Sequence, residues 1–295
     1  MTVPAPVVDA QVHVWLPEAV DRPWPAGGAE RALALHRHEP ISGLSLLGEM
    51  RAAGVDRAVL VPPFFEGYRN DYAVACATEA PDAFRVMARV DLRTGDPGPV
   101  RELLRDPVVA GIRLVFLPAD AGRVDDPAAE WLWAFAEEEQ VPVMLLASGQ
   151  LDALARIARS RPGLRLAVDH LGLTGQVTDA AIAPEIDALV ALSGLENVSV
   201  KVTAAPCYSS EPYPYPALHP FLRRLYDAYG PRRLFWGSDL SRLRGSYPDL
   251  VRLFREDLDF LSAEDVEAVM GANVLAWLGW PVADQGRGTL SSGRD

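Results

Sequence analysis

The apolar positions of this chain gather into eight short runs, which follow one another at intervals of roughly 30 residues. Several runs are nearly continuous in Val, Ile, Leu and Phe, as is typical of parallel strands that are buried on both faces. We therefore predict strands over Val7–Val14, Arg57–Val61, Phe84–Val90, Gly111–Phe116, Pro142–Leu146, Leu164–Val168, Val198–Val202 and Leu234–Trp236.

The stretches between these runs carry apolar residues at helical spacing. Helices are expected over Ile41–Ala53, Tyr72–Ala80, Pro99–Arg105, Glu130–Glu139, Leu151–Arg159, Pro184–Leu192 and Ala217–Tyr229. This alternation predicts an α/β protein with a (β/α)8 TIM barrel as its single domain, over residues 1–282, and a disordered Gly/Ser/Arg-rich tail over 283–295. A doubly wound sheet is the alternative, but the Gly-rich first turn that usually marks it is missing.

Three further segments complete the predicted architecture. Pro17–Pro40 and Pro206–Pro216 lie outside the repeat, and we expect both to be long loops at the active-site end of the barrel. Leu258–Trp280 is expected to close the fold, with a helix that begins after Ser262. Ser262 is the predicted N-cap and Asp265 its partner at the third helical position.

Polar motifs occur where three of the predicted strands end: Asp9-Ala10-Gln11-Val12-His13, Asp169-His170-Leu171-Gly172 and Gly237-Ser238-Asp239. The carboxyl ends of barrel strands meet at one pocket, so these side chains are expected to share a site. Strict alternation along the first strand would place Asp9, Gln11 and His13 together on its inner face. The same rule turns Arg113 and Lys201 inward.

Composition narrows the class of protein. The formal net charge of -12 argues against nucleic acid and anionic membrane surfaces as partners. The two cysteines, Cys76 and Cys207, lie too far apart in sequence to suggest a zinc ribbon or a disulfide framework. Neither a signal peptide nor a membrane-spanning run is evident. We expect a soluble cytoplasmic protein that acts on a small molecule, and a homodimer is one open possibility.

With these motifs in place, the chain resembles the amidohydrolase superfamily, in the amidohydrolase family 2 branch. The matching segments are DAQVHVW, GVDRAVLVPP, FRVMARVDL, GIRL, VDHLG, YGPRRLFWGSDLS and FLSAEDVEAVMGANVLAWLGW, which together span Val7 to Pro281. That branch contains lactone hydrolases and non-oxidative aromatic-acid decarboxylases. The resemblance therefore implies a TIM-barrel enzyme of one of these two kinds.

The resemblance also implies roles for individual residues. Asp239 would be the general base that takes a proton from the attacking water, while His13 and His170 would polarise the carbonyl. The same three residues would be the ligands of a divalent metal such as Zn. Arg113 would bind a substrate carboxylate by a bidentate contact. Further expected substrate contacts are Gln11, Trp15, Lys201 and Tyr208.

Two departures from the family pattern put the metal in question. Gln11 stands where the family usually has histidine, and a neutral amide oxygen is a poor zinc ligand. The fifth predicted strand also supplies no histidine. One bound metal and a metal-free site are therefore both open hypotheses.

The leading functional hypothesis is a hydrolase that opens a lactone, or a related cyclic ester, of a small carboxylated substrate. One alternative is a metal-dependent decarboxylase of an aromatic acid. Another is a catalytically degenerate barrel that acts as a binding protein, which the loss of the first histidine would favour. Structural roles also compete at single positions. Arg113 could pair with Asp91 or Asp169, Lys201 could extend to the rim, and His36 or His38 could reach the pocket from the first loop.

Overall fold

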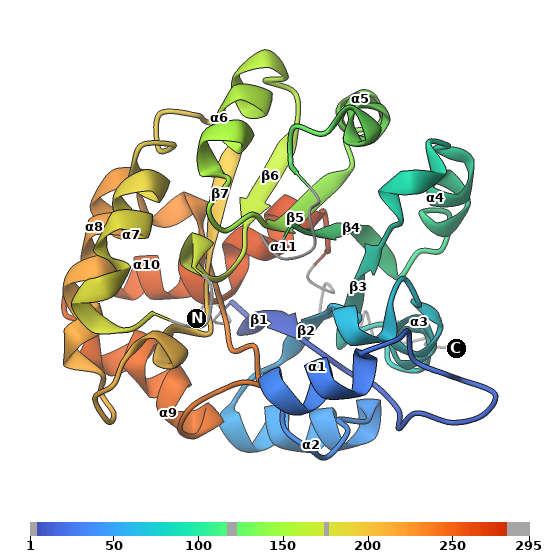
Figure 1. Cartoon of the computed structure of the whole chain (residues 1–295). Helices are drawn as coiled ribbons and strands as arrows, with labels where there is room; N and C mark the ends of the chain where they lie inside the picture. Colours follow the sequence, from blue (N-terminus) through green and yellow to red (C-terminus); the bar gives the residue numbers. More distant parts are fainter. Residues whose placement is uncertain (1–4, 117–122, 174–176, 282–295) are drawn as a thin grey trace, which may run out of the picture.

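The eight predicted strands form one parallel sheet that curls into a barrel. The computed structural model describes residues 5–116, 123–173 and 177–281, so the predicted disordered tail, 283–295, lies outside the described residues. Strand order follows the sequence, and Figure 1 shows the strands in the middle of the molecule. This confirms the predicted TIM barrel. The strands are β1 (Val8–Val12), β2 (Arg57–Leu60), β3 (Phe84–Arg89), β4 (Val109–Val115), β5 (Pro142–Leu146), β6 (Arg165–Val168), β7 (Val198–Thr203) and β8 (Leu234–Gly237).

Helices surround the strands, and the seven that were predicted are all present within a few residues of their expected limits (Figure 1). The expectation that 17–40 is only a loop is wrong, because it contains α1; the pattern also missed α9. Both are short helices, one after β1 and one after β8, and both are additional to the regular alternation of strands and helices. The helices are α1 (Gly28–Leu35), α2 (Gly43–Ala53), α3 (Asp71–Glu79), α4 (Gly98–Leu103), α5 (Glu130–Glu138), α6 (Leu151–Ser160), α7 (Ala183–Val190), α8 (His219–Tyr229), α9 (Tyr247–Arg252), α10 (Ala263–Glu267) and α11 (Asn273–Leu278).

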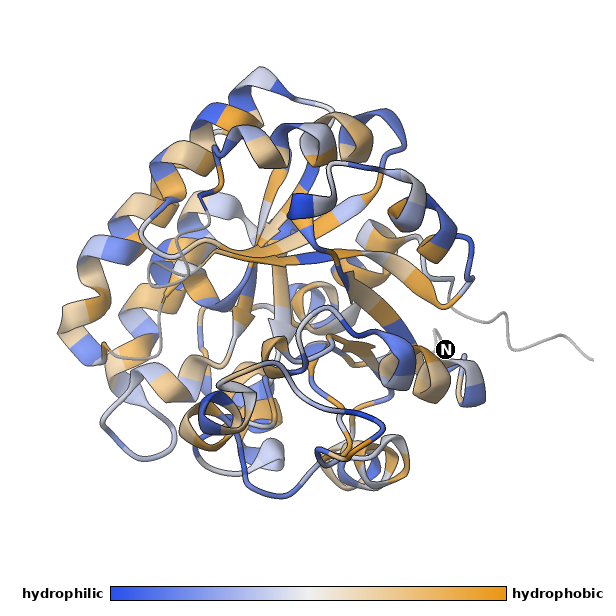
Figure 2. Cartoon of the chain, turned by 45° about the vertical axis from the view of Figure 1, so that its right-hand side comes forward, coloured by the Kyte–Doolittle hydropathy of each residue, from blue (hydrophilic) through white to orange (hydrophobic). Residues whose placement is uncertain are grey.

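Apolar side chains fill two layers, one inside the barrel and one between the barrel and the helices. Figure 2 shows mostly hydrophobic strands and helices with alternating hydrophobic and hydrophilic bands. The inner cluster includes Val59, Met87, Met144, Ala167 and Phe235. Polar side chains take over inside the barrel towards the carboxyl ends of the strands, and this change positions the candidate site.

The C-terminal segment closes the opposite end of the barrel. Ser262 caps α10, and its hydroxyl accepts a hydrogen bond from Asp265 N while the Asp265 side chain bonds back to Ser262 N, as predicted. The ring of Trp280 packs under the guanidinium groups of Arg57 and Arg85. No helix in the described parts of the chain is long and apolar enough to span a membrane.

A register irregularity in β1 corrects one prediction. Val8 and Ala10 belong to the inner cluster, whereas Val12 belongs to the outer one. This change of face coincides with a break in the pairing with β2 between Asp9 and Val12. An extra residue in one strand shifts the alternation of side chains. Asp9 therefore does not share the face of Gln11 and His13, as strict alternation had suggested.

Asp9 instead fastens β1 to β8 at the seam of the barrel. Its carboxylate accepts hydrogen bonds from Ser238 N at 2.8 Å and from the hydroxyls of Ser238 and Tyr247. A Cβ at Gly237 would lie 2.7 Å from Asp9 Oδ1, so this close approach requires glycine. Asp239 N donates to Gln11 O at 2.9 Å just above. The seam thus holds the third polar motif against the first.

Candidate active site

Asp239 lies between the two predicted histidines at the carboxyl ends of β1, β6 and β8. Its Oδ1 is 3.2 Å from His13 Nε2, and its Oδ2 is 3.8 Å from His170 Nε2. The carboxylate is fully buried, and neither oxygen accepts a well-aligned hydrogen bond from the described residues. A buried carboxylate with unused acceptor capacity is suited to binding a water or a ligand hydroxyl.

Each histidine is oriented by a neighbour on an adjacent strand. His13 Nδ1 lies 2.6 Å from Val61 O, and a carbonyl can only accept, so this nitrogen carries a proton. Thr203 Oγ1 accepts from His170 N at 3.3 Å and lies 2.8 Å from His170 Nδ1. Both contacts leave Nε2 of the ring directed at Asp239. The geometry thus brings together the three predicted catalytic side chains.

The backbone at these positions is in the left-handed region. The φ angles are 52° at His170, 57° at Leu171 and 51° at Asp239. Such conformations are uncommon for residues other than glycine, and they concentrate at functional sites because the surrounding structure must stabilise them. Here they turn the side chains at the ends of β6 and β8 towards one point.

A second charged network lies beside the first. Asp169 binds Lys201 Nζ at 2.9 Å through Oδ1 and Arg113 Nε at 2.9 Å through Oδ2. Lys201 also donates to Gln11 Oε1 and is completely buried. The suggestion that Lys201 extends to the rim is therefore wrong, because its charge is compensated inside the barrel. Arg113 pairs with Asp169 rather than Asp91, and its two terminal nitrogens make no hydrogen bond to the described residues.

Burial and neighbouring charges decide the ionisation of this site. Burial lowers the pKa of His170 to about 3, so this imidazole is neutral near pH 7. Burial alone would raise the pKa of Asp239, but His170, His13 and Arg242 outweigh it and hold that pKa well below its usual value. Lys201 and Arg113 likewise overcome burial and lower the pKa of Asp169 to about 2. Both carboxylates are therefore ionised at neutral pH.

The donor set does not suit a divalent metal. Gln11 gives its oxygen to the ammonium of Lys201, which fixes the direction of the amide, and its Nε2 therefore faces His13 Nε2 at 3.4 Å. A metal needs lone pairs at this point, whereas the amide presents N–H donors. The described residues also contain no cluster of three His, Cys, Asp or Glu side chains arranged to hold a metal. The side chains around Asp239 therefore do not form a suitable ligand set for a divalent metal.

Sequence reasoning did not assign a role to Arg242, and gave His36 only as one option. Arg242 Nη1 lies 3.5 Å from Asp239 Oδ2. His36 is buried, its Nδ1 lies 2.7 Å from Ser241 Oγ, and its ring packs edge-on against His13 with centroids 5.2 Å apart. The spacing of Arg242 three residues after Asp239 was the available signal. No comparable signal marks His36, because it lies at the C-terminal end of α1, far in sequence from the polar motifs at the strand ends.

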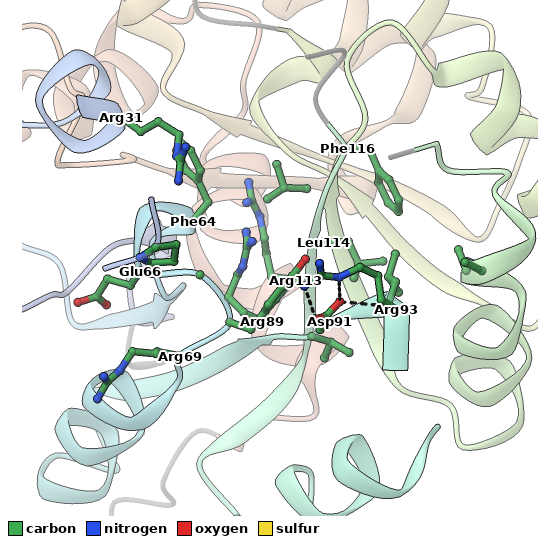
Figure 3. Close-up of a pocket in the computed structure, with 18 of the residues that line it drawn as sticks. Arg31, Phe64, Glu66, Arg69, Arg89, Asp91, Arg93, Arg113, Leu114 and Phe116 are labelled. Carbon is green, nitrogen blue, oxygen red and sulfur yellow. Dashed lines mark hydrogen bonds and ion pairs between the residues drawn. The ribbon is translucent and has the colours of Figure 1, made fainter. Parts of the chain in front are cut away.

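A cavity of about 780 Å³ adjoins this cluster at Arg113. Figure 3 shows Arg89 and Arg113 side by side in it, and they are paired residues of β3 and β4. Of the other expected substrate contacts, Trp15 is buried against Phe65 and His36 outside the cavity lining. Tyr208 is buried near Arg242. The cavity is also lined by Trp24, Phe64, Glu66, Tyr68, Arg31, Arg69, Arg93 and Phe116.

This chain has histidines and an ionised aspartate at the carboxyl ends of parallel barrel strands. It is therefore one of the barrel enzymes whose catalytic site is formed by the strand ends. The chain belongs to the amidohydrolase family, whose model matches residues 8–280. It is 30% identical, over 250 residues, to the L-fucono-1,5-lactonase of Burkholderia ambifaria, covering 82% of this chain and 83% of that protein.

Solved structures share the fold over nearly the whole chain. A probable 2-pyrone-4,6-dicarboxylic acid hydrolase of Acinetobacter baumannii, with citric acid bound, is 17% identical with a TM-score of 0.76, covering 93% of this chain and 99% of that one. An amidohydrolase of Burkholderia multivorans, with bound zinc, is 22% identical with a TM-score of 0.77, covering 94% of this chain and 100% of that one.

Proposed function

We propose that this enzyme hydrolyses a lactone of a small carboxylated substrate, with Asp239 as the general base, and that it does so without a metal. The observation that carries the proposal is the ionised Asp239 carboxylate, which is flanked by His13 and His170 and has no aligned hydrogen bond to either oxygen. The lactonase relative and the pyrone-dicarboxylate hydrolase neighbour support ester-bond hydrolysis.

The reaction needs one water. Asp239 takes a proton from the water as its oxygen attacks the carbonyl carbon, and the carbonyl oxygen becomes negatively charged. When the intermediate collapses, the ring C–O bond breaks and the departing alkoxide recovers the proton from Asp239. His13 and His170 hold Asp239 and the water in place. Arg113, which lines the cavity, is the proposed contact for a substrate carboxylate.

A lactone panel tests the proposal directly. It should include L-fucono-1,5-lactone and 2-pyrone-4,6-dicarboxylate, with ring opening followed by proton release. Asp239→Asn preserves size and should lower kcat by about 10²–10⁴-fold. Asp227→Asn changes an exposed aspartate on α8 and is the matched control, which should leave kcat unchanged. Parental activity in Asp239→Asn would remove the proposed base.

Metal dependence needs a separate measurement. Protein purified without added metal should contain no stoichiometric metal, and a chelator should leave its lactonase activity intact. Loss of a bound metal together with activity would overturn the metal-free proposal. Release of carbon dioxide from a hydroxylated benzoate, without lactone hydrolysis, would favour the decarboxylase instead. Binding of lactones without turnover would indicate a degenerate barrel. The homodimer and the cytoplasmic location stay predictions.

A further inference from the structure

Lactone hydrolysis places negative charge on the carbonyl oxygen, and the site must stabilise that charge. Preorganised donors and cations aimed at this oxygen are usually the largest contribution to such catalysis. His170 is neutral near pH 7 because burial lowers its pKa to about 3. It can donate a hydrogen bond but supplies no charge. In a metal-free reaction, a cationic side chain of the chain itself would stabilise this charge more strongly than neutral donors alone.

Three cations lie close to the candidate catalytic residues, and two of them are already engaged. Lys201 is completely buried between Asp169 and Gln11. Arg113 is bound to Asp169 through Nε, and it lines the cavity of about 780 Å³. In the described part of the chain, neither Lys201 nor Arg113 forms an ion pair or a hydrogen bond with Asp239.

Arg242 differs from both. Its Nη1 is 3.5 Å from Asp239 Oδ2, and its guanidinium also lies within hydrogen-bonding reach of the Tyr208 hydroxyl. The side chain is 17% exposed, so it lies at an accessible edge of the buried cluster. Arg233, by contrast, donates to the carbonyls of Ser193, Leu195, Val198 and Tyr229.

The hydroxyl of Tyr208 provides a second unused donor beside Arg242. Tyr208 is completely buried, and apart from the adjacent Arg242 guanidinium, which can only donate, its hydroxyl has no hydrogen-bond partner among the described residues. Burial raises the pKa of Tyr208, and the neighbouring Arg242 guanidinium partly opposes this. The hydroxyl therefore keeps its proton and can donate it. A buried, unpaired hydroxyl is costly unless a ligand uses it.

The backbone fixes the position of both groups. Arg242 N donates to Asp239 O at 2.8 Å, which forms a tight turn and places the two side chains on the same side. Cys207 Sγ donates to Arg242 O at 3.1 Å, and Cys207 immediately precedes Tyr208. This bond thus joins the segment that follows β7 to the one that follows β8, next to Tyr208 and Arg242. This arrangement resembles a prebuilt site for one anionic oxygen.

We propose that Arg242 and the Tyr208 hydroxyl bind the carbonyl oxygen of the scissile ester and stabilise the oxyanion of the tetrahedral intermediate. The inference rests on the proposed lactone hydrolysis. As water attacks, the carbonyl π electrons move to this oxygen, and the guanidinium balances the new charge. The electrons return when the ring C–O bond breaks, and the leaving oxygen takes the proton held by Asp239. Arg242 is not consumed or deprotonated.

The test compares four variants on the lactone that the parent enzyme hydrolyses fastest. Arg242→Gln should lower kcat by about 10²–10³-fold while KM changes little, because the contact strengthens in the transition state. Arg242→Lys keeps the charge and should lose less, and Tyr208→Phe should lose less than Arg242→Gln. Arg244→Gln is the matched control. Arg244 donates to Ser209 O and does not contact Asp239, so this variant should retain parental kcat.

Chemical rescue separates a catalytic charge from a structural contact. In Arg242→Ala, guanidinium ion at a concentration too low to unfold the protein should restore part of kcat, whereas urea of similar shape should not. A kcat of Arg242→Gln within about threefold of the parent, or equal effects of guanidinium and urea on Arg242→Ala, would overturn the inference. If the parent hydrolyses no lactone, the proposed function itself fails and this inference fails with it.

Discussion

Acidification should destabilise the folded protein through its buried neutral histidines. Burial lowers the pKa of His36 to about 3 from its ordinary 6.5; the positive charge of Arg242 lowers this pKa further, whereas the negative charge of Asp239 opposes the shift. Between pH 6.5 and about pH 3, His36 is protonated in the unfolded chain but not in the folded chain. The free energy of unfolding therefore falls as pH decreases. One pH unit is worth about 1.4 kcal/mol, and His36 therefore costs about 2 kcal/mol near pH 5.

Other groups titrate over the same range, so the comparison must isolate His36. His170 has the same sign and a similar pKa. Glu66 acts in the opposite direction, because burial raises its pKa to about 7 and the folded state takes up its proton first. Both contributions are present in the parent and in His36→Asn. They cancel when the pH-dependent change in unfolding free energy is compared between the two proteins.

Urea unfolding followed by tryptophan fluorescence at about pH 7 and pH 5 gives the required free energies. The parent should lose about 2 kcal/mol more than His36→Asn on acidification, whatever the stability of the variant at pH 7. His38→Asn changes an exposed histidine two residues away and should follow the parent. Equal losses in the parent and His36→Asn would show that His36 is not held neutral by burial.

Three further outcomes follow from the contacts. Tyr247→Phe removes a hydroxyl that donates to buried Asp9 and should reduce the unfolding free energy by about 2 kcal/mol, whereas Tyr226→Phe, at a partly exposed contact, should cost less in the same urea titration. Lys201→Met leaves Asp169 with only Arg113 and should cost about 3–5 kcal/mol, part of which Asp169→Asn in the same chain should restore. Arg113→Gln should raise KM for a carboxylated lactone more than for an uncharged one, and equal increases would argue against a carboxylate contact.

The barrel was predictable because most of its strands are short, largely apolar runs and the helices between them carry apolar residues at helical spacing. The N-cap at Ser262 was also predictable, because Asp265 lies three positions later, at the spacing of a capping box. α1 was missed because its apolar residues are partly exposed: Leu33 is 59% exposed and Leu35 42%. Patterns reveal elements that bury one face in the core, and α1 does so only weakly.

The inner face of β1 shows where reasoning from alternation ends. A single irregularity between Asp9 and Val12 moved Asp9 to the seam and left Gln11 and His13 inside. Nothing in the residue types marks that position, because the break depends on how β1 meets β2 and β8. Asp9 consequently has a structural role: its carboxylate accepts hydrogen bonds from the hydroxyls of Ser238 and Tyr247.

Gln11 is the residue at which sequence and structure together decide the chemistry. The sequence shows that an amide replaces the usual histidine, but an amide can present either oxygen or nitrogen to its neighbours. Lys201, which lies 190 residues later and meets Gln11 only in the folded barrel, takes the oxygen and turns the N–H groups towards His13. The position that would need a lone pair for a metal thus holds a donor, so in a metal-free reaction the oxyanion is stabilised by side chains of the protein. Among those side chains Arg242 carries a full positive charge beside Asp239, so its removal should reduce stabilisation of the oxyanion the most.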